Sequence, residues 1–332
     1  MNDSYNSNNQ SGTGTVMKKS TGHCWVQTDG ELLLCSTSSQ LRKQMVYPTT
    51  GKHHSVQQVI ENDHTDPIAV GDQVRFIRSN GNGMVVEVLP RRNRLSRRAA
   101  STGTHAFEQV IAANIDLVIP VFAAARPEPA WNLLDRNLAS AESLDLPVLV
   151  CLTKVDLVLG PDGSLPDELM DVIRMYQKIG YEFVFTSSAT GYGMDQLRQA
   201  LKDKTSAFIG KSGVGKTSLL NVVQPGMGRR VGEVGRETGK GRHTTTMLEM
   251  LPLDFGGRLI DTPGMREFGL WDTGEDDLAL FFREMQPYIG KCKFGLNCLH
   301  IDEPGCAVRK AVLDGQVDPR RYRSMVILQQ NG

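Results

Sequence analysis

The chain contains four nucleotide-binding motifs, and their order is unusual. Thr153-Lys154-Val155-Asp156 and Ser187-Ser188-Ala189 have the pattern of base-binding motifs, and both precede the glycine-rich segment Gly210–Thr217 and Asp261-Thr262-Pro263-Gly264. Folds that use these motifs usually place the phosphate loop first and the base-binding motifs last. One cut and one rejoining of the chain interconvert the two orders, provided that the old termini lie close together. The sequence therefore predicts a circularly permuted nucleotide-binding fold.

The glycine-rich segment matches the phosphate-loop pattern G-x-x-x-x-G-K-[ST], between a predicted strand and a predicted helix. Its backbone N–H groups and the helix N-terminus are suited to hold phosphates. We expect Lys216 to reach the outer phosphates as a catalytic group and Thr217 to bind Mg²⁺. The predicted loop residues of the nucleotide site are Gly210, Lys211, Ser212, Gly213, Val214, Gly215, Lys216, Thr217 and Ser218.

Base recognition is predicted at the ends of two other strands. A carboxylate at Asp156 can accept hydrogen bonds from guanine N1 and the 2-amino group, a donor pair that adenine lacks. The stem of Lys154 can lie along the base, and backbone N–H groups of Ser187-Ser188-Ala189 can reach guanine O6. Thr153 stands where Asn is usual and makes fewer hydrogen bonds, so we expect a lower nucleotide affinity. A plain surface Lys–Asp turn is the alternative for the tetrapeptide taken alone.

The motifs identify the groups that would hydrolyse the nucleotide less directly than those that would bind it. Asp261 follows a predicted strand and is expected to hold Mg²⁺, while the Gly264 amide senses the γ-phosphate. The next residue is Met265, which cannot polarise water as a Gln would. Either hydrolysis is slow or another group acts. His243 is the candidate for orienting or deprotonating water, and Thr245 for binding Mg²⁺ and the γ-phosphate; an exposed loop histidine without a catalytic role is the alternative.

A second constellation lies near the C-terminus. Cys292-x5-Cys298-x-His300-x5-Cys306 supplies three thiolates and one imidazole. This donor set completes a tetrahedral shell, as a structural zinc requires, and leaves no position for water. The other cysteines of the six are scattered, which favours a reducing compartment over a disulfide framework.

The rest of the chain suggests three folded parts after a disordered polar tail over residues 1–20. Residues 21–98 predict an OB-type β-barrel, 99–270 an α/β nucleotide-binding domain with a mostly parallel sheet, and 271–332 a helical zinc-binding domain. Expected barrel strands are His23–Gln27, Glu31–Ser36, Asp72–Ile77 and Gly83–Leu89. Expected later strands are Ile115–Phe122, Val148–Leu152, Glu182–Thr186, Ala207–Ile209, Met247–Leu253 and Arg258–Ile260. Expected helices are Trp131–Leu144, Asp167–Ile179, Met194–Leu201, Thr217–Val223, Asp276–Ile289, Val308–Gly315 and Pro319–Gln330.

Charge limits the possible partners. Lys+Arg and Asp+Glu both number 37, so the protein is no general polycation, and a nucleic-acid contact must come from local patches. One candidate is Arg91–Arg98, with five arginines in eight residues; a solvated basic turn is its alternative. Further cations near the zinc segment are Lys291, Lys293, Arg309, Lys310, Arg320, Arg321 and Arg323. Without an apolar run of membrane-spanning length or an apolar leader, we expect a cytoplasmic protein with no membrane contact.

The combined pattern resembles the small ribosomal subunit biogenesis GTPase (RsgA) family over residues 21–332, through the motif order, Gly210–Lys216, Gly241–Thr246 and the Cys/His spacing. The resemblance implies GTP/GDP, Mg²⁺ and one structural Zn²⁺ as ligands. It also implies a monomer that binds the small ribosomal subunit and its rRNA, hydrolyses GTP when the subunit stimulates it, and leaves; its catalytic histidine falls on His243. The Cys292–Cys298 spacing is one residue longer than we expect of the family, and the Asn-rich tail has no counterpart.

Three other classes compete with this interpretation. One is an RNA-binding assembly chaperone whose GTP site is barely catalytic, which Met265 favours. A P-loop ATPase is disfavoured by Asp156, and a zinc-finger DNA reader by the absence of a ββα pattern. If the protein is a GTPase switch, GTP is expected to order Gln224–Thr246 and hydrolysis to release it. A further hypothesis is that this ordering reorients the zinc segment.

Overall fold

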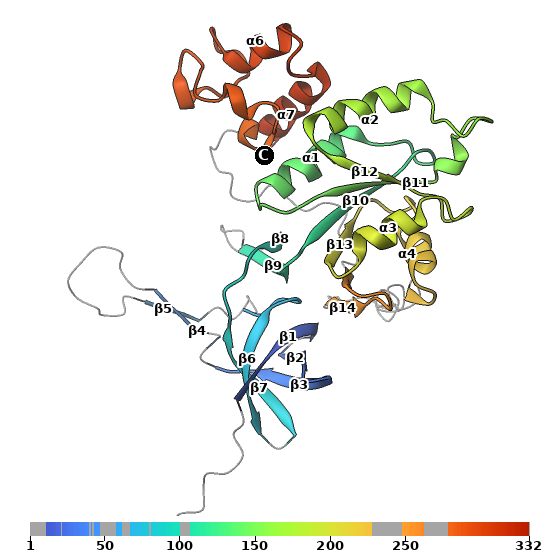
Figure 1. The fold of residues 1–332 in the computed structure, drawn as a ribbon. Helices are drawn as coiled ribbons and strands as arrows, with labels where there is room; N and C mark the ends of the chain where they lie inside the picture. The colour runs from blue at the N-terminus through green and yellow to red at the C-terminus, as the bar shows by residue number, and fades with distance from the viewer. Residues whose placement is uncertain are drawn as a thin grey trace, which may run out of the picture. The chain divides into compact units, whose positions relative to one another are not determined.

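The computed structural model describes residues 11–20, 22–39, 41, 43–46, 58–61, 67–79, 81–99, 107–227, 248–261 and 278–331. The chain forms two compact units (Figure 1). The first comprises Met1–Ile115 with Val234–Pro252, and the second Asp116–Glu233 with Leu253–Gly332.

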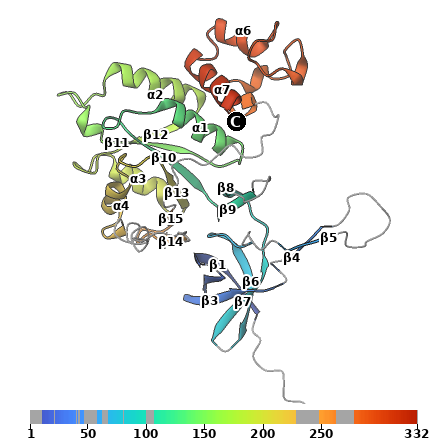
Figure 2. The same ribbon diagram turned by 180° about the vertical axis from the view of Figure 1, so that it is seen from behind.

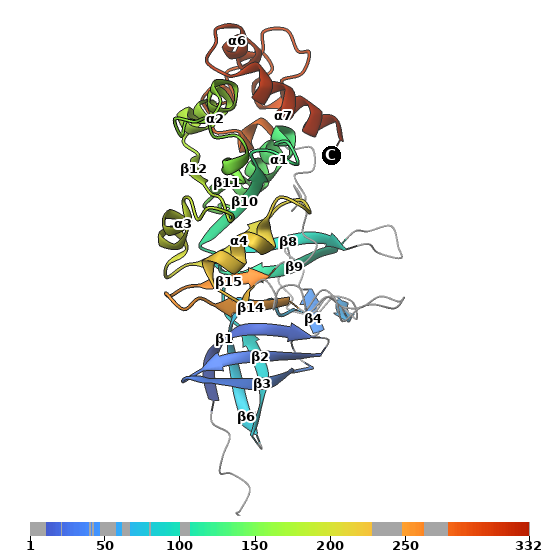
Figure 3. The ribbon, with the colours of Figure 1, turned by 90° about the vertical axis from the view of Figure 1, so that its right-hand side faces the viewer.

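The core of the first unit is a closed five-stranded barrel (Figure 3). Its strands are β1 (Ser11–Ser20), β2 (His23–Thr28), β3 (Glu31–Thr37), β6 (Gln73–Ser79) and β7 (Asn82–Val88), in the order β1-β2-β3-β7-β6, with β6 pairing back to β1. Alternate residues such as Val26, Leu33 and Phe76 fill the interior. At Gly12 a Cβ atom would lie 2.7 Å from the Phe76 ring, so only glycine lets β1 pass there. The predicted barrel is confirmed.

The predicted disordered tail is wrong for its second half, because Ser11–Ser20 forms β1. This strand is mostly polar, and Val16 and Met17 are its only fully buried hydrophobic residues. It is held by pairing on both sides, antiparallel to β2 and to β6. Backbone hydrogen bonds to other strands do not require apolar side chains, so they cannot be recognised from amino-acid composition. The polar composition of residues 11–20 therefore indicated disorder.

Further strands complete the first unit. β4 (Lys43–Val46) pairs with β5 (Gln58–Glu61), β8 (Arg94–Ala99) pairs with β9 (Phe107–Ala113), and β14 (Leu248–Pro252) pairs antiparallel with β1. The arginine-rich run therefore enters a strand. Arg91 forms a bidentate ion pair with the fully buried carboxylate of Asp72, at 2.7 and 2.8 Å. That guanidinium is part of the barrel's structure, so the predicted phosphate contact cannot rest on it.

The second unit contains a five-stranded parallel sheet of order β12-β11-β10-β13-β15 (Figures 1 and 2). Its strands are β10 (Leu117–Ala123), β11 (Leu149–Thr153), β12 (Glu182–Phe185), β13 (Thr205–Ile209) and β15 (Arg258–Asp261). Its helices are α1 (Trp131–Glu142), α2 (Asp167–Ile179), α3 (Met194–Leu201) and α4 (Lys216–Val223), and η1 (Val155–Leu157) is a 3-10 turn. The five strands and the four α-helices were each predicted to within two residues at either end, whereas η1 was not predicted. The α/β fold class is confirmed.

The C-terminal part packs against α1 through a core that includes Phe282, Met285, Val308 and Ala139 of α1. Its elements are η2 (Leu278–Phe281), η3 (Gln286–Tyr288), η4 (Gly295–Asn297), α6 (Ala307–Leu313) and α7 (Pro319–Asn331). The predicted helix Asp276–Ile289 is wrong: its described part contains two short 3-10 helices, η2 and η3, separated by residues in turn conformation. Pro287 stands at the start of η3, and a proline in the middle of an α-helix lacks the required N–H and clashes with the preceding turn.

One buried polar side chain of α1 gives a stability prediction. Asn137 is fully buried, and neither amide atom has a hydrogen-bond partner among the described residues. An unsatisfied buried group costs about 1–3 kcal/mol. We therefore expect Asn137→Leu to raise the free energy of unfolding by about 1 kcal/mol, measured by urea denaturation. Asn137→Ala is the control, because the cavity that it leaves offsets the gain. A Leu variant less stable than wild type would contradict the prediction.

Candidate functional site

The glycine-rich loop joins β13 to α4. It begins directly after Ile209, and α4 begins at Lys216. Gly213 and Gly215 have φ values of +84° and +97°, a backbone conformation that is strained for any residue with a side chain. At Gly210 a Cβ atom would lie 2.5 Å from the Val121 carbonyl oxygen, so glycine also permits close packing on β10. A glycine-rich turn that ends in a helix N-terminus is suited to bind phosphates.

Lys216 is directed into this loop. Its ammonium donates hydrogen bonds to the carbonyl oxygens of Gly210 and Lys211, the latter at 2.9 Å. Burial lowers its pKa from the ordinary value. The amine is thus held beside the backbone of the predicted phosphate site, and Thr217 and Ser218 follow it in the first turn of α4.

The base-binding motif meets the phosphate loop directly. Thr153 ends β11 and is 2% exposed, and its Oγ1 lies 2.5 Å from the Val214 carbonyl oxygen and 3.2 Å from that of Phe122. Next to it, Lys154 Nζ donates to the Gly213 carbonyl oxygen at 2.7 Å. Two segments about sixty residues apart therefore lie in contact. The Thr153 hydroxyl has a single hydrogen, so it can donate to only one of these two carbonyl oxygens at a time.

The two predicted base-reading segments are also neighbours. Lys154 has a φ of +56° and turns the chain into η1, which carries the half-exposed Asp156. Val155 N–H donates to the Thr186 carbonyl oxygen at 3.3 Å, immediately before Ser187. The Ser187 hydroxyl is buried and accepts hydrogen bonds from the N–H groups of Ala189 and Thr190, both at 3.2 Å. This hydroxyl shapes the loop; Ser188 lies half-buried at its bend.

The remaining predicted residues are only partly described. Asp261 is the last residue of β15, and β15 pairs in parallel with β13 with Ile260 opposite Ala207. Its backbone thus reaches the edge of the sheet at which the phosphate loop begins. His243, Thr245, Gly264 and Met265 lie outside the described residues, as does most of Gln224–Thr246.

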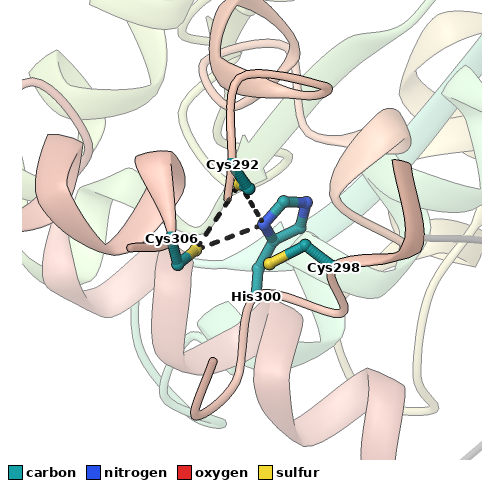
Figure 4. A group of neighbouring side chains, drawn as sticks. All are labelled: Cys292, Cys298, His300 and Cys306. Carbon is teal, nitrogen blue, oxygen red and sulfur yellow. Dashed lines mark hydrogen bonds between the residues drawn. The ribbon is translucent and has the colours of Figure 1, made fainter. Parts of the chain in front are cut away.

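The four predicted metal ligands converge (Figure 4). Their ligand atoms lie within 4.8 Å of one another, and all four side chains are buried: Cys292, Cys298, His300 and Cys306. The two sulfurs of Cys292 and Cys306 are 3.9 Å apart, and His300 Nδ1 lies 3.4 and 3.3 Å from them. A tetrahedral Zn²⁺ requires separations of about 3.8 Å between sulfurs and about 3.6 Å between sulfur and nitrogen. The residues fit one structural zinc.

The surrounding backbone supports these ligands. Ala307 N–H donates to Cys292 Sγ at 3.2 Å, and Arg309 N–H donates to Cys306 Sγ at 3.4 Å as the cap of α6. Such bonds favour the thiolates that zinc binds. Tyr322 Oη of α7 donates to the His300 carbonyl oxygen at 2.7 Å. The carboxylate of Glu303 accepts N–H groups of the same loop, which gives it a structural role.

The other three cysteines lie outside the metal-ligand group found among the described residues. Cys24, Cys35 and Cys151 are buried and form no disulfide. Burial raises the pKa of Cys35 to about 11 and that of Cys151 to about 12, so both stay protonated thiols.

A buried ion network, which sequence reasoning missed, attaches the C-terminal part to α1 and α2. Arg321 of α7, expected among the surface cations, is 1% exposed. Its guanidinium lies 2.6 Å from Asp135 of α1 and 2.6 Å from Glu284. Tyr176 of α2 donates to the same Asp135 at 2.6 Å, and the Phe282 ring lies 4.4 Å from the guanidinium. Burial by itself lowers the pKa of Arg321, but the two carboxylates outweigh it and hold the pKa above its ordinary value.

A second contact runs along the same junction. Arg283 Nε lies 2.7 Å from Glu142 of α1, and its guanidinium lies 4.4 Å from the Tyr181 ring centre. Tyr181 Oη donates to Glu142 at 3.2 Å. In Figures 1 and 2 α7 lies beside α1, and the polar contacts explain why it is fixed there.

A permuted parallel sheet, a phosphate loop in contact with a guanine-type base motif and a C-terminal Cys₃His cluster that could hold a metal ion together define the class of circularly permuted GTPases. The model of the RsgA GTPase family matches residues 88–271. The chain belongs to this family of GTP-hydrolysing enzymes.

Individual relatives agree with this assignment. The small ribosomal subunit biogenesis GTPase RsgA of Caldanaerobacter subterraneus subsp. tengcongensis is 36% identical over 315 residues, covering 95% of this chain and 94% of the relative. The Pseudomonas aeruginosa (strain LESB58) protein of the same name is 42% identical over 258 residues, covering 77% and 74%. The crystal structure of YjeQ from Thermotoga maritima matches with a TM-score of 0.71 and 29% identity, covering 97% of this chain and 98% of that one. YloQ, a circularly permuted GTPase, matches with a TM-score of 0.68 and 27% identity, covering 97% and 95%.

Among the described residues, no helix is both long enough and apolar enough to cross a bilayer.

Proposed function

We propose that this protein is a late assembly factor of the small ribosomal subunit. It binds the subunit and its rRNA, hydrolyses GTP when the subunit stimulates it, and then dissociates. The observation that supports this most directly is the contact of Thr153 with Val214, which joins the guanine-type motif and the phosphate loop into one site. Two relatives that match 95% and 94% of this chain carry the name small ribosomal subunit biogenesis GTPase RsgA.

In this proposal each motif has one task. Asp156 reads the guanine base with the Ser187–Ala189 loop, and Lys216 with the loop backbone binds the phosphates. Thr217, Thr245 and Asp261 are the residues that would hold Mg²⁺, which when bound neutralises phosphate charge. His243 orients the attacking water, because Met265 cannot. In this proposal the protein acts as a monomer.

The test measures GTP hydrolysis by the full chain, with and without purified small subunits. We expect subunits to accelerate hydrolysis by wild type. His243→Ala should lose about 10²–10⁴-fold of the stimulated rate, the usual contribution of general acid–base catalysis, while keeping its GDP affinity. Lys216→Ala should lose both nucleotide affinity and turnover. Hydrolysis that subunits leave unchanged would contradict the proposal.

The same preparations test release and base choice. Subunits should bind more tightly in the presence of a non-hydrolysable GTP analogue than with GDP, and equal binding would contradict a GTP-controlled cycle. GTP should outcompete ATP in wild type, and Asp156→Asn should lose that preference.

Met265 gives one specific reason to keep a second candidate, an RNA-binding assembly chaperone with a barely catalytic GTP site. That candidate predicts tight subunit binding, with turnover that neither His243→Ala nor Lys216→Ala alters.

A further inference from the structure

The loop around the Cys₃His cluster exposes three large apolar side chains. Phe294 is 47% exposed, Leu296 77% and Leu299 41%. Lys291 and Lys293 lie in the same loop and are exposed as well. We call these five side chains the zinc-loop surface. Large apolar side chains gathered on one exposed loop mark an interaction site more often than isolated ones do.

Hydrogen bonds hold the loop backbone in place, so the exposure of its apolar side chains is a fixed property of the fold. The buried ligands Cys292 and Cys298 stand on either side of Phe294 and Leu296. Gly295 N–H donates to the Cys292 carbonyl oxygen at 2.9 Å, and Lys293 N–H donates to the Gly305 carbonyl oxygen at 3.1 Å. Such a loop presents its side chains with little conformational entropy left to lose on binding.

The charge of this surface is positive. Neither Lys291 nor Lys293 forms an ion pair within the described part of the chain, and Lys293 Nζ lies 5.9 Å from the centre of the Phe294 ring. The nearby carboxylate of Glu303 is bound to backbone N–H groups of its own loop. An anionic partner therefore meets cations beside an exposed aromatic ring.

We propose that the zinc-loop surface binds an unpaired base of RNA, with the base stacked on Phe294 and its flanking phosphates held by Lys291 and Lys293. The inference rests on the proposed function and specifies its RNA contact. Single-stranded RNA is recognised by stacking of splayed bases on aromatic side chains combined with cationic contacts to the backbone. An apolar pocket of a protein would use Phe294 and Leu296 but has no need of the two lysines.

The experiment compares Phe294→Ala, Phe294→Leu and Phe294→Trp with wild type as full-length, zinc-loaded proteins. Binding is measured to purified small subunits and to a labelled single-stranded oligouridine. We expect Ala and Leu to weaken binding roughly tenfold, because base–aromatic stacking has about that effect, and Trp to restore it. The double variant Lys291→Gln, Lys293→Gln should reduce the slope of log affinity against log salt by about 1–2. Leu313→Ala, at an 87% exposed position outside the loop, is the control.

Zinc content and GTP hydrolysis without subunits should be unchanged in the Phe294 variants. If Phe294→Leu binds subunits as wild type does while Phe294→Ala is weak, the partner is an apolar protein pocket and the proposal is wrong. It is also wrong if all Phe294 variants bind like wild type. In both cases wild type still binds subunits, whereas failure of the proposed function abolishes that binding or its effect on hydrolysis.

Discussion

Arg321→Met is expected to lower the free energy of unfolding of the C-terminal part by about 3–5 kcal/mol, the usual cost of breaking a buried ion pair. The substitution keeps the volume of the side chain but leaves the carboxylates of Asp135 and Glu284 without their cation. Urea denaturation gives the total, and hydrogen exchange of α1 and α7 locates the loss.

The neighbouring arginine is a matched control. Arg320 is 53% exposed and pairs with Asp318 at 2.8 Å. Surface pairs contribute about 0–1 kcal/mol, so Arg320→Met should be nearly neutral. In the Arg321→Met background, Asp135→Asn should recover part of the loss, because it removes one buried charge and still accepts the hydrogen bond from Tyr176. Equal stability of the Arg321 and Arg320 variants would show that the ion network does not hold the two parts together.

Removal of zinc should have the second large effect. The ligand cysteines belong to the same apolar core as Phe282, Met285 and Val308. Structural zinc supplies an apparent binding free energy of about 10–16 kcal/mol in zinc-finger peptides. We expect a strong chelator, or Cys298→Ser, to abolish protection of α6 and α7 from hydrogen exchange, with zinc content followed by mass spectrometry.

Cys24→Ala is the control for this prediction, since Cys24 is equally buried but lies in the barrel core. It should keep one zinc per chain and full protection of α6 and α7. A Cys298→Ser protein that retains both stoichiometric zinc and protected helices would overturn the assignment of the site.

The elements that the sequence predicts best are those with local signals. Helix α2 was predicted at its exact bounds: a proline precedes it, and Gly180 ends it with a φ of +101°. Strands β10, β11 and β13 are short, largely apolar segments that are buried at every position, a pattern typical of the central strands of a parallel sheet. Strand β1 was missed because it depends on pairing with β2 and β6 rather than on its own residues.

For the candidate site, the sequence motifs name residues but not the contacts between them. The motifs identify Thr153 and Val214 separately, yet only the fold brings their atoms within hydrogen-bonding distance. The structural role of Arg321 could not be predicted from the sequence. An arginine near a metal-ligand segment suggests a basic surface patch. The neighbouring residues give no sign that Arg321 is buried and pairs with Asp135, which is far away in the sequence.

The order of the strands explains why a permuted chain can keep an intact pocket. β10 has β11 on one side and β13 on the other, so the sheet is built outward from β10 in two opposite directions. In open α/β sheets the crevice for a ligand forms at such a reversal, outside the carboxyl ends of the strands. The position of such a crevice depends on which strands are neighbours in the sheet and not on which strand comes first along the chain. Moving the chain's cut to another loop therefore leaves the crevice where it was.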